Sequence, residues 1–234
     1  MNISVIIPAL NEQRDIEVAV RSASDGAEVI VVDGGSIDNT RALAANAGAK
    51  VVVTYPGRGL QMDEGARLAS GDILLFLHAD SRLPKFWVEA IENALLDKDV
   101  VGGAFSLAID SNKRIYRFIE WGVKLRSGLL KVIYGDQAIF IRKDIFNNIG
   151  GFKNLPLMED VDCVKRLKLA GRLVCIDKVV STSPRRWEER GVLRNTLRNW
   201  LFFALYSAGL APDTLYKLYY GKSFGHNNRI KTGL

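Results

Sequence analysis

The sequence predicts an α/β fold with a mostly parallel central sheet flanked by helices, followed by a C-terminal helical extension. Short apolar runs rich in β-branched residues alternate with segments of helix-forming composition, a pattern typical of parallel strands joined by helices. The 234 residues, 48% of them hydrophobic and 25% charged, have the composition of an ordinary globular chain. Disordered, collagen-like and low-complexity chains are excluded, because those have few apolar residues or a strong compositional bias.

Four predicted strands lie in the first third of the chain, and a helix follows each of the first three. The strands are residues 3–7, 29–32, 50–54 and 73–77, and the helices are 11–23, 38–47 and 59–69. The run 73–77 is continuously apolar, which suits a strand buried on both faces of a sheet. Pro8 and the Gly-rich turn at 57–59 separate neighbouring elements.

After residue 80 the alternation is less regular. Helices are predicted over 84–96, 113–126, 158–170 and 192–210, and strands over 100–109, 138–142, 173–176 and 179–181. The last helix is nearly all apolar from Trp200 onward but too short to span a bilayer. We therefore expect one α/β domain over 1–187, a helical extension over 188–222 and a mobile tail over 223–234.

Cysteine usage and the N-terminus predict a cytoplasmic protein. Cys163 and Cys175 lack a Cys-x-x-Cys spacing, which argues against a disulfide framework and against a cysteine-ligated zinc site. The first apolar run has no basic stretch before it and is broken by Pro8, so it resembles neither a signal peptide nor an anchor.

The net charge of +6 is unevenly distributed: residues 1–160 carry −3 and residues 161–234 carry +9. A basic segment can bind nucleic acid, anionic lipid or a phosphorylated ligand. Nucleic acid is not expected, because no helix-turn-helix or RNA-recognition signature is present. The arginines and aromatic residues of 185–206 leave open peripheral contact with the inner face of an anionic membrane, burial against the domain, or a homo-oligomer.

Candidate ligand-binding residues follow three of the predicted strands. These are Pro8, Ala9, Asn11 and Glu12 after the first strand, Asp33, Gly34, Ser36 and Asp38 after the second, and His78 and Asp80 after the fourth. The carboxyl ends of parallel strands meet at one edge of a sheet, where ligands bind. Helix capping and tight turns are the alternative explanation for most of these residues.

Three common motifs are absent from the sequence. There is no Gly-x-Gly-x-x-Gly after the first strand, no Walker-type phosphate loop and no Gly-x-Ser-x-Gly elbow. Dinucleotide dehydrogenases, P-loop nucleotidases and serine hydrolases are therefore disfavoured.

Taken in order, the motifs resemble those of the family 2 glycosyltransferases of GT-A fold. They are Ile-Pro-Ala-Leu-Asn-Glu at 7–12, Val-Asp-Gly-Gly-Ser-Ile-Asp-Asn-Thr at 32–40, His-Ala-Asp at 78–80 and Glu-Asp at 159–160. The resemblance covers about residues 2–187. Segments 57–66 and 135–137 are similar to a small bacterial branch of that family.

The resemblance implies a site for a nucleoside diphosphate sugar, with a uridine diphosphate sugar as the default donor. Pro8, Glu12 and Asp33 would hold the base and ribose. The segment 78–80 corresponds to the family's Asp-x-Asp, so Asp80 would be the principal ligand of a divalent cation, with His78 in the first position. Mg²⁺ or Mn²⁺ suits such a site, since Mg²⁺ takes one or two carboxylates together with substrate phosphates.

The resemblance also assigns the chemistry of transfer. Asp160 would take the proton of the acceptor hydroxyl in an inverting reaction, and Glu159 would shape the acceptor side. Charge that complements a helix dipole is the alternative for this pair. Phosphate contacts are expected from Arg58 and Arg67. Acceptor or diphosphate contacts are expected from Gly103, Phe105, Gly135, Asp136, Gln137, Arg186 and Trp187.

Two other functions stay open from the sequence. A nucleotidyltransferase shares such a sheet but usually has a Gly-rich basic loop after its first strand, whereas residues 8–15 offer only Arg14. A protein that binds a membrane surface without turnover is the second alternative. The acceptor is unknown at this stage.

Overall fold

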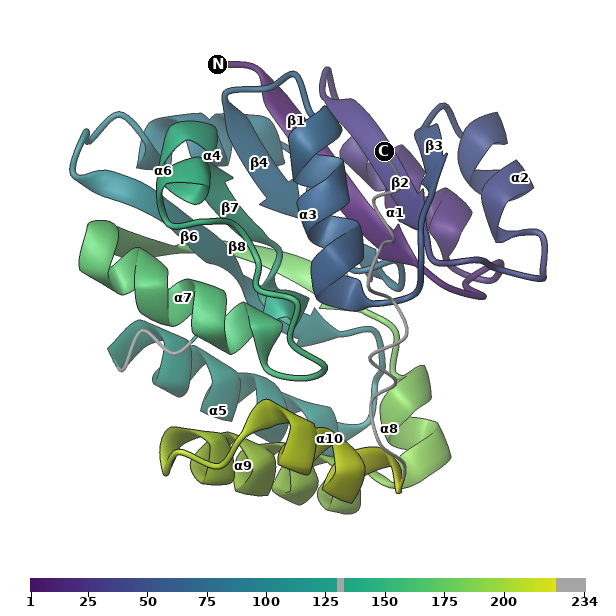
Figure 1. The fold of residues 1–234 in the computed structure, drawn as a ribbon, viewed down its shortest axis with the longest axis vertical. Coiled ribbons are helices and arrows are strands. Elements are labelled where there is room, and N and C mark those ends of the chain that lie inside the picture. The colour runs from purple at the N-terminus through teal and green to yellow at the C-terminus, as the bar shows by residue number, and fades with distance from the viewer. Residues whose placement is uncertain (130–132, 222–234) are drawn as a thin grey trace, which may run out of the picture.

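A mixed eight-stranded sheet forms the centre of the computed structural model, which describes residues 1–129 and 133–221 (Figure 1). The strands are β1 (Ile3–Ala9), β2 (Glu28–Asp33), β3 (Lys50–Val53), β4 (Ile73–Phe76), β5 (Ser81–Arg82), β6 (Val100–Ile109), β7 (Ile139–Arg142) and β8 (Arg172–Thr182). Their order across the sheet is β3-β2-β1-β4-β7-β6-β8-β5. The predicted tail, 223–234, lies outside the described residues.

The first half of the sheet is parallel, as predicted from the alternating pattern. β1 pairs in parallel with β2 and β4, β2 with β3, and β6 with β8. β7 is antiparallel to both β4 and β6, and β5 is antiparallel to β8. The carboxyl ends of β1, β2 and β4 therefore meet at one edge, which brings the polar residues after them together.

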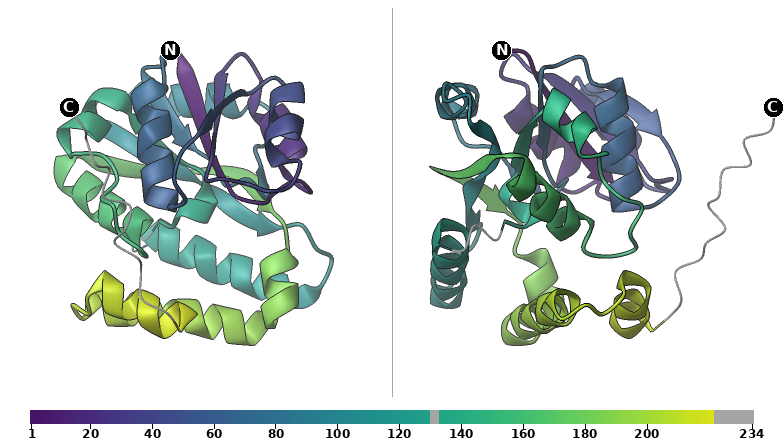
Figure 2. Two further views of the ribbon diagram at one scale, coloured as in Figure 1. Left: turned by 45° about the vertical axis from the view of Figure 1, so that its right-hand side comes forward. Right: turned by 60° about the vertical axis from the view of Figure 1, so that its left-hand side comes forward.

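Helices cover both faces of the sheet (Figures 1 and 2). They are α1 (Ile16–Ala23), α2 (Thr40–Asn46), α3 (Arg58–Leu68), α4 (Trp87–Ala94), α5 (Arg114–Leu129), the 3₁₀ helix η1 (Gly135–Gln137), α6 (Lys143–Asn148), α7 (Glu159–Ala170), α8 (Arg185–Arg190), α9 (Val192–Ser207) and α10 (Pro212–Tyr220). No helix in the described part of the chain has the length and apolar content needed to cross a bilayer.

Two apolar clusters hold these layers together. One contains Val5 and Ile7 of β1 with residues of α1, α2 and α4, and includes the fully buried Trp87. The other contains Ile6 of β1 with residues of α3, α6 and α7. Successive side chains of a strand point to opposite faces, so one short apolar run supplies both clusters. Because both faces of β1 are buried, the position of this strand is fixed, and so is the start of the loop that follows it.

Several elements differ from the prediction. Residues 173–176 and 179–181 were expected to form two short strands, but β8 is continuous through them. Asp177 and Lys178 lie at a register shift, because Phe105 pairs with Ile176 and the next residue pairs with Val179. These two polar residues thus form a bulge rather than a turn. The short elements β5, α6 and α8 were not predicted.

Both cysteines are free thiols, as the sequence predicted. Cys163 is buried in α7, and this burial raises the pKa of its thiol to about 12. A thiol with such a pKa is protonated at neutral pH, so Cys163 packs as an apolar residue and is not a nucleophile.

The C-terminal helices form a separate layer beyond the carboxyl ends of β1 and β4 (Figures 1 and 2). The ring of Phe203 in α9 packs on Tyr134 at a centroid distance of 5.6 Å. The ammonium of Lys165 in α7 lies 4.3 Å from the ring centre of Tyr206. The predicted extension is thus in contact with the body of the domain, on the side where the strands end.

Candidate functional site

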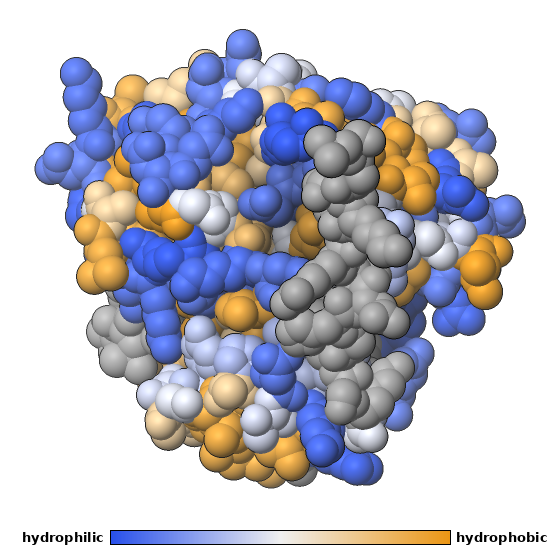
Figure 3. Space-filling model, viewed as in Figure 1, coloured by the Kyte–Doolittle hydropathy of each residue, from blue (hydrophilic) through white to orange (hydrophobic). Residues whose placement is uncertain are grey.

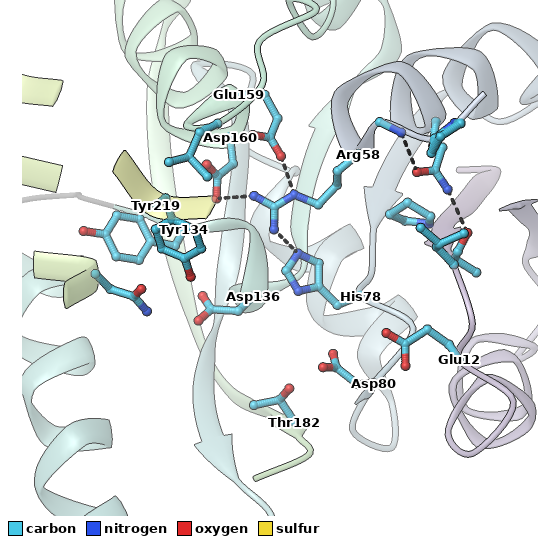
Figure 4. Close-up of a pocket in the computed structure, with 18 of the residues that line it drawn as sticks. Glu12, Arg58, His78, Asp80, Tyr134, Asp136, Glu159, Asp160, Thr182 and Tyr219 are labelled. Carbon is cyan, nitrogen blue, oxygen red and sulfur yellow. Dashed lines mark hydrogen bonds and ion pairs between the residues drawn. The ribbon is translucent and has the colours of Figure 1, made fainter. Parts of the chain in front are cut away.

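A cavity of about 1240 Å³ lies between the carboxyl edge of the sheet and the C-terminal helices. The loops after β1 and β4 line one side of it, and the N-terminal ends of α3 and α7 line its middle. Residues of α8, α9 and α10 line the opposite side. Figure 4 shows how the polar side chains gather in this space.

The loops after β1 and β2 are held together by side-chain hydrogen bonds. The backbone N–H of Asn11 donates to the Ser36 hydroxyl at 2.8 Å, and the N–H of Glu12 donates to the Thr40 hydroxyl at 2.8 Å. In return, the N–H of Ile37 donates to the Asn11 side chain at 3.0 Å. Asn11 and Ser36 therefore connect two loops instead of capping their own helices, and Glu12 is presented to the cavity.

Asp33 is fully buried in the turn after β2. Its Oδ1 accepts the backbone N–H groups of Gly35 at 3.0 Å and Ser36 at 2.8 Å, whereas its Oδ2 has no hydrogen-bond partner among the described residues. A carboxylate oxygen buried without a donor is costly. Asp33 thus orders the turn with one oxygen, and its second oxygen is buried beneath the turn.

Gln61 of α3 is a cavity residue that the sequence did not reveal. Its amide Nε2 donates to the carbonyls of Ala9 at 2.9 Å and Val32 at 2.7 Å. Its Oε1 accepts the N–H of Gly57 at 3.3 Å. One buried side chain therefore fixes the ends of β1 and β2 relative to the start of α3.

Arg58, at the start of α3, lies at the middle of the cavity (Figure 4). Its Nε donates to the Glu159 carboxylate, its Nη2 lies 3.8 Å from Oδ2 of Asp160, and its Nη1 lies 3.4 Å from Nε2 of His78. Burial alone would lower the pKa of Arg58, but the two carboxylates more than offset it and raise the pKa above the ordinary value. The guanidinium is therefore a permanent cation that joins residues from three distant segments.

Both oxygens of Asp160 are held by the backbone. Oδ2 accepts the N–H of Gly135 at 2.7 Å, and Oδ1 accepts the N–H of Val161 at 2.8 Å. A methyl group added at Gly135 would lie 3.1 Å from Oδ2 of Asp160 and 3.1 Å from Nε2 of His78. Only glycine lets η1 approach both side chains without displacing one of them. The carboxylate is fixed in position, only 8% exposed, and lines the cavity.

Residues 4–154 match the family model described as Glycosyl transferase family 2. The chain belongs to this family. The matched segment contains the loops after β1, β2 and β4 and ends shortly before Glu159 and Asp160.

Curated relatives of this family member include mycobacterial enzymes. Glucosyl-3-phosphoglycerate synthase of Mycobacterium tuberculosis (strain H37Rv) is 39% identical over 92 residues, which cover 33% of this chain and only 28% of the synthase. The PGL/p-HBAD biosynthesis glycosyltransferase of Mycobacterium bovis (strain BCG) is 29% identical over 211 residues, 83% of this chain and 79% of that enzyme.

Solved structures share the fold of this chain. The M. tuberculosis glucosyl-3-phosphoglycerate synthase in complex with Mn²⁺, UDP and glucosyl-3-phosphoglycerate has a TM-score of 0.60 at 23% identity, covering 89% of this chain and 80% of that one. S. aureus TarS in complex with UDP-GlcNAc has a TM-score of 0.62 at 18% identity, covering 78% and 58%. These structures have the GT-A fold, and the predicted fold class is confirmed.

Most residues predicted to hold the donor and the metal line the cavity. They are Pro8, Ala9, Asn11, Glu12, Asp38, Arg58, His78 and Asp80. Asp33, Gly34 and Ser36 are buried in the adjoining turn, and a methyl group at Gly34 would lie 3.2 Å from Gln61. These three residues shape the loop and do not form the wall of the cavity.

Arg67 is not part of the cavity, contrary to the prediction. It lies at the far end of α3 from Arg58, with its side chain exposed, and its guanidinium pairs with Glu64 one turn away. The i, i+3 spacing brings these two side chains together on the outer face of the helix. Arg67 is thus a surface residue.

The predicted acceptor residues divide into two groups. Asp136 and Trp187 line the cavity, and Gly135 lies beside two of its lining residues, His78 and Asp160. Gly103 and Phe105 lie in β6 within the sheet, where Phe105 is fully buried against Phe140. The prediction for this second pair was wrong, because β6 turns both residues into the core.

Gln137 is also a structural residue rather than an acceptor ligand. Its Nε2 donates to the carbonyl of Phe105 at 3.1 Å, and its Oε1 accepts the N–H of Tyr134 at 3.3 Å. With both ends of the buried amide engaged by the backbone, Gln137 holds η1 against β6. The side chain of Arg186 lies outside the described part of the structure.

The neighbouring Arg185 lines the cavity instead. It pairs with Glu12, and its Nη1 lies 3.6 Å from Oδ2 of Asp15. Burial alone would lower the pKa of Arg185, but its hydrogen bond and ion pair with Glu12 raise it. This contact joins the start of α8 to the loop after β1.

The aromatic wall was missed by sequence reasoning. We use this name for the cavity-lining rings of Tyr134, Phe202, Phe203, Tyr216, Tyr219 and Tyr220. A signal existed: Asn195, Asn199 and Phe202 recur at helical spacing and all line the cavity, whereas the apolar side chains between them face outward. What the sequence could not provide is the position of α9 and α10 relative to the sheet.

Proposed function

We propose that this family 2 enzyme is a metal-dependent, inverting glycosyltransferase that moves a sugar from a nucleoside diphosphate sugar to an acceptor hydroxyl. The convergence of Asp80 and Asp160 on one cavity carries the proposal. These carboxylates are distant in sequence, come from different elements, and lie on either side of His78 and Arg58 (Figure 4). A carboxylate that holds a metal and a second that takes a proton are the groups such a transfer needs.

The donor side of the cavity is assigned to the loops after β1 and β2. Glu12 and Asp38 line it, and the buried Asp33 orders the turn beside them. Carboxylates accept hydrogen bonds from the imide of a base and from ribose hydroxyls. Solved structures of similar fold contain UDP or a UDP-sugar, which supports a uridine diphosphate sugar as the donor of this enzyme.

The side chains around Asp80 fit Mg²⁺ or Mn²⁺. In the described residues no three His, Cys, Asp or Glu side chains form a ready-made metal cluster. Mg²⁺ is often held by one or two carboxylates and completes its shell with phosphates and water, so Asp80 is the assigned ligand. A bound cation would neutralise charge on the departing diphosphate. His78 is less suited as a ligand here, because Nη1 of the Arg58 cation lies 3.4 Å from its Nε2.

Asp160 is assigned the role of general base. The acceptor oxygen attacks the anomeric carbon, its proton passes to the Asp160 carboxylate, and the bond from the anomeric carbon to the diphosphate oxygen breaks with its electron pair. A single displacement of this kind inverts the anomeric centre. The backbone N–H groups of Gly135 and Val161 and the Arg58 cation keep the carboxylate in place.

The released product tests the proposal. On incubation with a UDP-sugar and Mn²⁺, we expect UDP to form without pyrophosphate, since the bond broken is at the sugar carbon. Pyrophosphate formed from UTP and a sugar 1-phosphate would instead support the alternative, a nucleotidyltransferase. The β-phosphate in UDP should carry no solvent oxygen when the reaction runs in ¹⁸O-water.

Contact with an anionic membrane is a second proposal, supported by the outer face of α9. Leu197, Trp200 and Leu201 are exposed there, with Trp200 at 59%, and Arg194 is exposed on the same helix. Apolar surface gathers along the lower edge of the molecule in Figure 3. Aromatic and basic side chains together suit the headgroup region of anionic lipid.

We therefore expect co-sedimentation with phosphatidylserine-containing liposomes, and a loss of at least about fivefold in the Trp200→Glu variant, because a charge replaces an apolar ring that inserts into the lipid headgroup region. Unchanged binding by Trp200→Glu would contradict membrane contact through this face.

A homo-oligomer formed by the same face is the competing prediction. It would appear as a rise in sedimentation coefficient with protein concentration that Trp200→Glu abolishes.

A further inference from the structure

Helix α5 carries large apolar side chains on its solvent-facing side. Phe118 is 78% exposed and Trp121 is 65% exposed. Ile115 and Leu125, on the same helix, are exposed as well. Intervals of three, three and four residues place these four side chains along one stripe of the helix, which we call the α5 stripe. Exposed apolar patches of this kind are typical of contact sites with proteins or membranes.

The opposite side of α5 is fixed on the domain, at the periphery of the molecule (Figures 1 and 2). Tyr116 is fully buried, and its ring centre lies 6.4 Å from that of Trp187. Val123 packs on one of the two apolar clusters. The Glu120 carboxylate accepts the backbone N–H of Ile109 at 2.7 Å. These contacts set the rotation of the helix, so the α5 stripe faces solvent and not the core.

Basic side chains accompany the α5 stripe. The sequence of α5 contains one acidic residue, Glu120, and its carboxylate faces the domain. Arg114, Arg117 and Lys124 are exposed. Arg117 pairs with Glu120 at 3.1 Å, and Lys124 pairs with the exposed Asp177 at 2.9 Å. Exposed ion pairs contribute little to stability, so these cations can exchange their partners for other anions at low cost.

We infer that the α5 stripe docks on a lipid bilayer with anionic headgroups. Aromatic and leucine side chains insert into the headgroup region, while arginine and lysine reach the lipid phosphates. Charge argues against a second copy of the chain as the occupant. A two-fold contact places the same surface on both subunits, so the basic side chains of the two copies would approach one another. The α5 stripe is a different surface from the outer face of α9, and the inference depends neither on that face nor on glycosyl transfer.

Vesicles of phosphatidylcholine, with and without phosphatidylserine, test the inference in a co-sedimentation assay at low salt. The full chain is expected to bind the vesicles that contain phosphatidylserine. Trp121→Glu should weaken this binding at least about tenfold, because a charge replaces a large apolar ring that the headgroup region would bury. Leu96→Glu is the matched control: Leu96 is also exposed but follows α4, away from α5 (Figure 1), and its substitution changes the net charge equally. Its binding should stay within about twofold of wild type.

Two further measurements separate the apolar and the basic contributions. Arg114→Gln should weaken binding to phosphatidylserine vesicles about fivefold, since one basic side chain near the membrane surface is removed. Lipids brominated in their acyl chains quench tryptophan that inserts among them. Quenching should therefore be smaller in Trp121→Phe, which keeps an apolar ring and binds the vesicles, than in the wild-type protein.

The inference is overturned if the wild-type protein does not bind vesicles with phosphatidylserine, or if Trp121→Glu binds them as tightly as Leu96→Glu. Self-association that Trp121→Glu abolishes, without any vesicle binding, would assign the α5 stripe to a second copy instead. Phe118→Glu repeats the test on the same stripe in case Trp121→Glu does not fold. The assay of UDP release in solution and the Trp200→Glu variant test the earlier proposals separately, so their failure is distinct from failure at α5.

Discussion

The Asp160→Asn variant is expected to lose sugar transfer by about 10²- to 10⁴-fold in kcat, the contribution typical of a positioned general base. The carboxamide cannot take the proton from the acceptor hydroxyl. Nucleotide affinity should stay within about twofold of wild type, because Asp160 lies at the acceptor side of Arg58 and contacts η1. Steady-state kinetics and calorimetric titration with UDP and Mn²⁺ measure the two quantities separately.

A structural effect of this substitution has to be separated from the chemical one. Both carboxylate oxygens of Asp160 accept backbone N–H bonds, and asparagine can accept only at one of its two positions. One lost bond costs about 1 kcal/mol, which shifts the melting temperature by only a few degrees. Asp25→Asn, at an exposed turn, is the matched control with unchanged activity. More than a tenth of wild-type activity in a folded Asp160→Asn protein would show that another group is the base.

The second large effect is expected from Asp80→Ala. This carboxylate lines the cavity and is only 7% exposed. If it is the protein ligand of the cation, its removal should lower kcat/KM by about 100-fold or more, since a bound cation contributes several kcal/mol to stabilising the transition state. The affinity for UDP should also become independent of Mn²⁺. Titration of UDP with and without the metal measures this directly.

Asp110→Ala is the control for Asp80→Ala. Asp110 follows β6 near Asp80, but its side chain is 57% exposed and pairs with Arg82 at 3.3 Å. This variant should retain metal-dependent affinity for UDP. An Asp80→Ala protein in which Mn²⁺ still strengthens UDP binding by the wild-type factor would exclude Asp80 as the principal ligand.

Much of the fold could be predicted because local and global signals agree. The run 73–77 is apolar throughout, and β4 is buried on both faces; 100–109 was predicted to be a strand, and β6 has those bounds. β8 was split in the prediction because Asp177 and Lys178 resemble a turn, and only pairing with β6 reveals a bulge. The antiparallel insertion of β7 between β4 and β6 is likewise a property of the assembled sheet.

The donor side of the site was predictable for a geometric reason, and the acceptor side was not. Glu12, Asp38 and Asp80 follow strands whose carboxyl ends meet at one edge, so sequence position alone brought them together. The predicted acceptor contacts of Gly103 and Phe105 were wrong, because a residue inside a buried strand faces the core whatever its distance from the site. The aromatic wall depends on the docking of α9 and α10, which contacts distant in sequence determine.

A crystal structure with UDP and Mn²⁺ tests the central claim most directly, namely that one cavity holds a cation beside Asp80 and a diphosphate between that cation and Asp160. Anomalous scattering locates the manganese without reference to the protein. The account predicts one peak about 2.0–2.2 Å from an Asp80 oxygen and from oxygens of both phosphates, with the Asp160 carboxylate facing the space beyond the β-phosphate. A manganese peak elsewhere, or UDP bound away from the loops after β1 and β2, would contradict it.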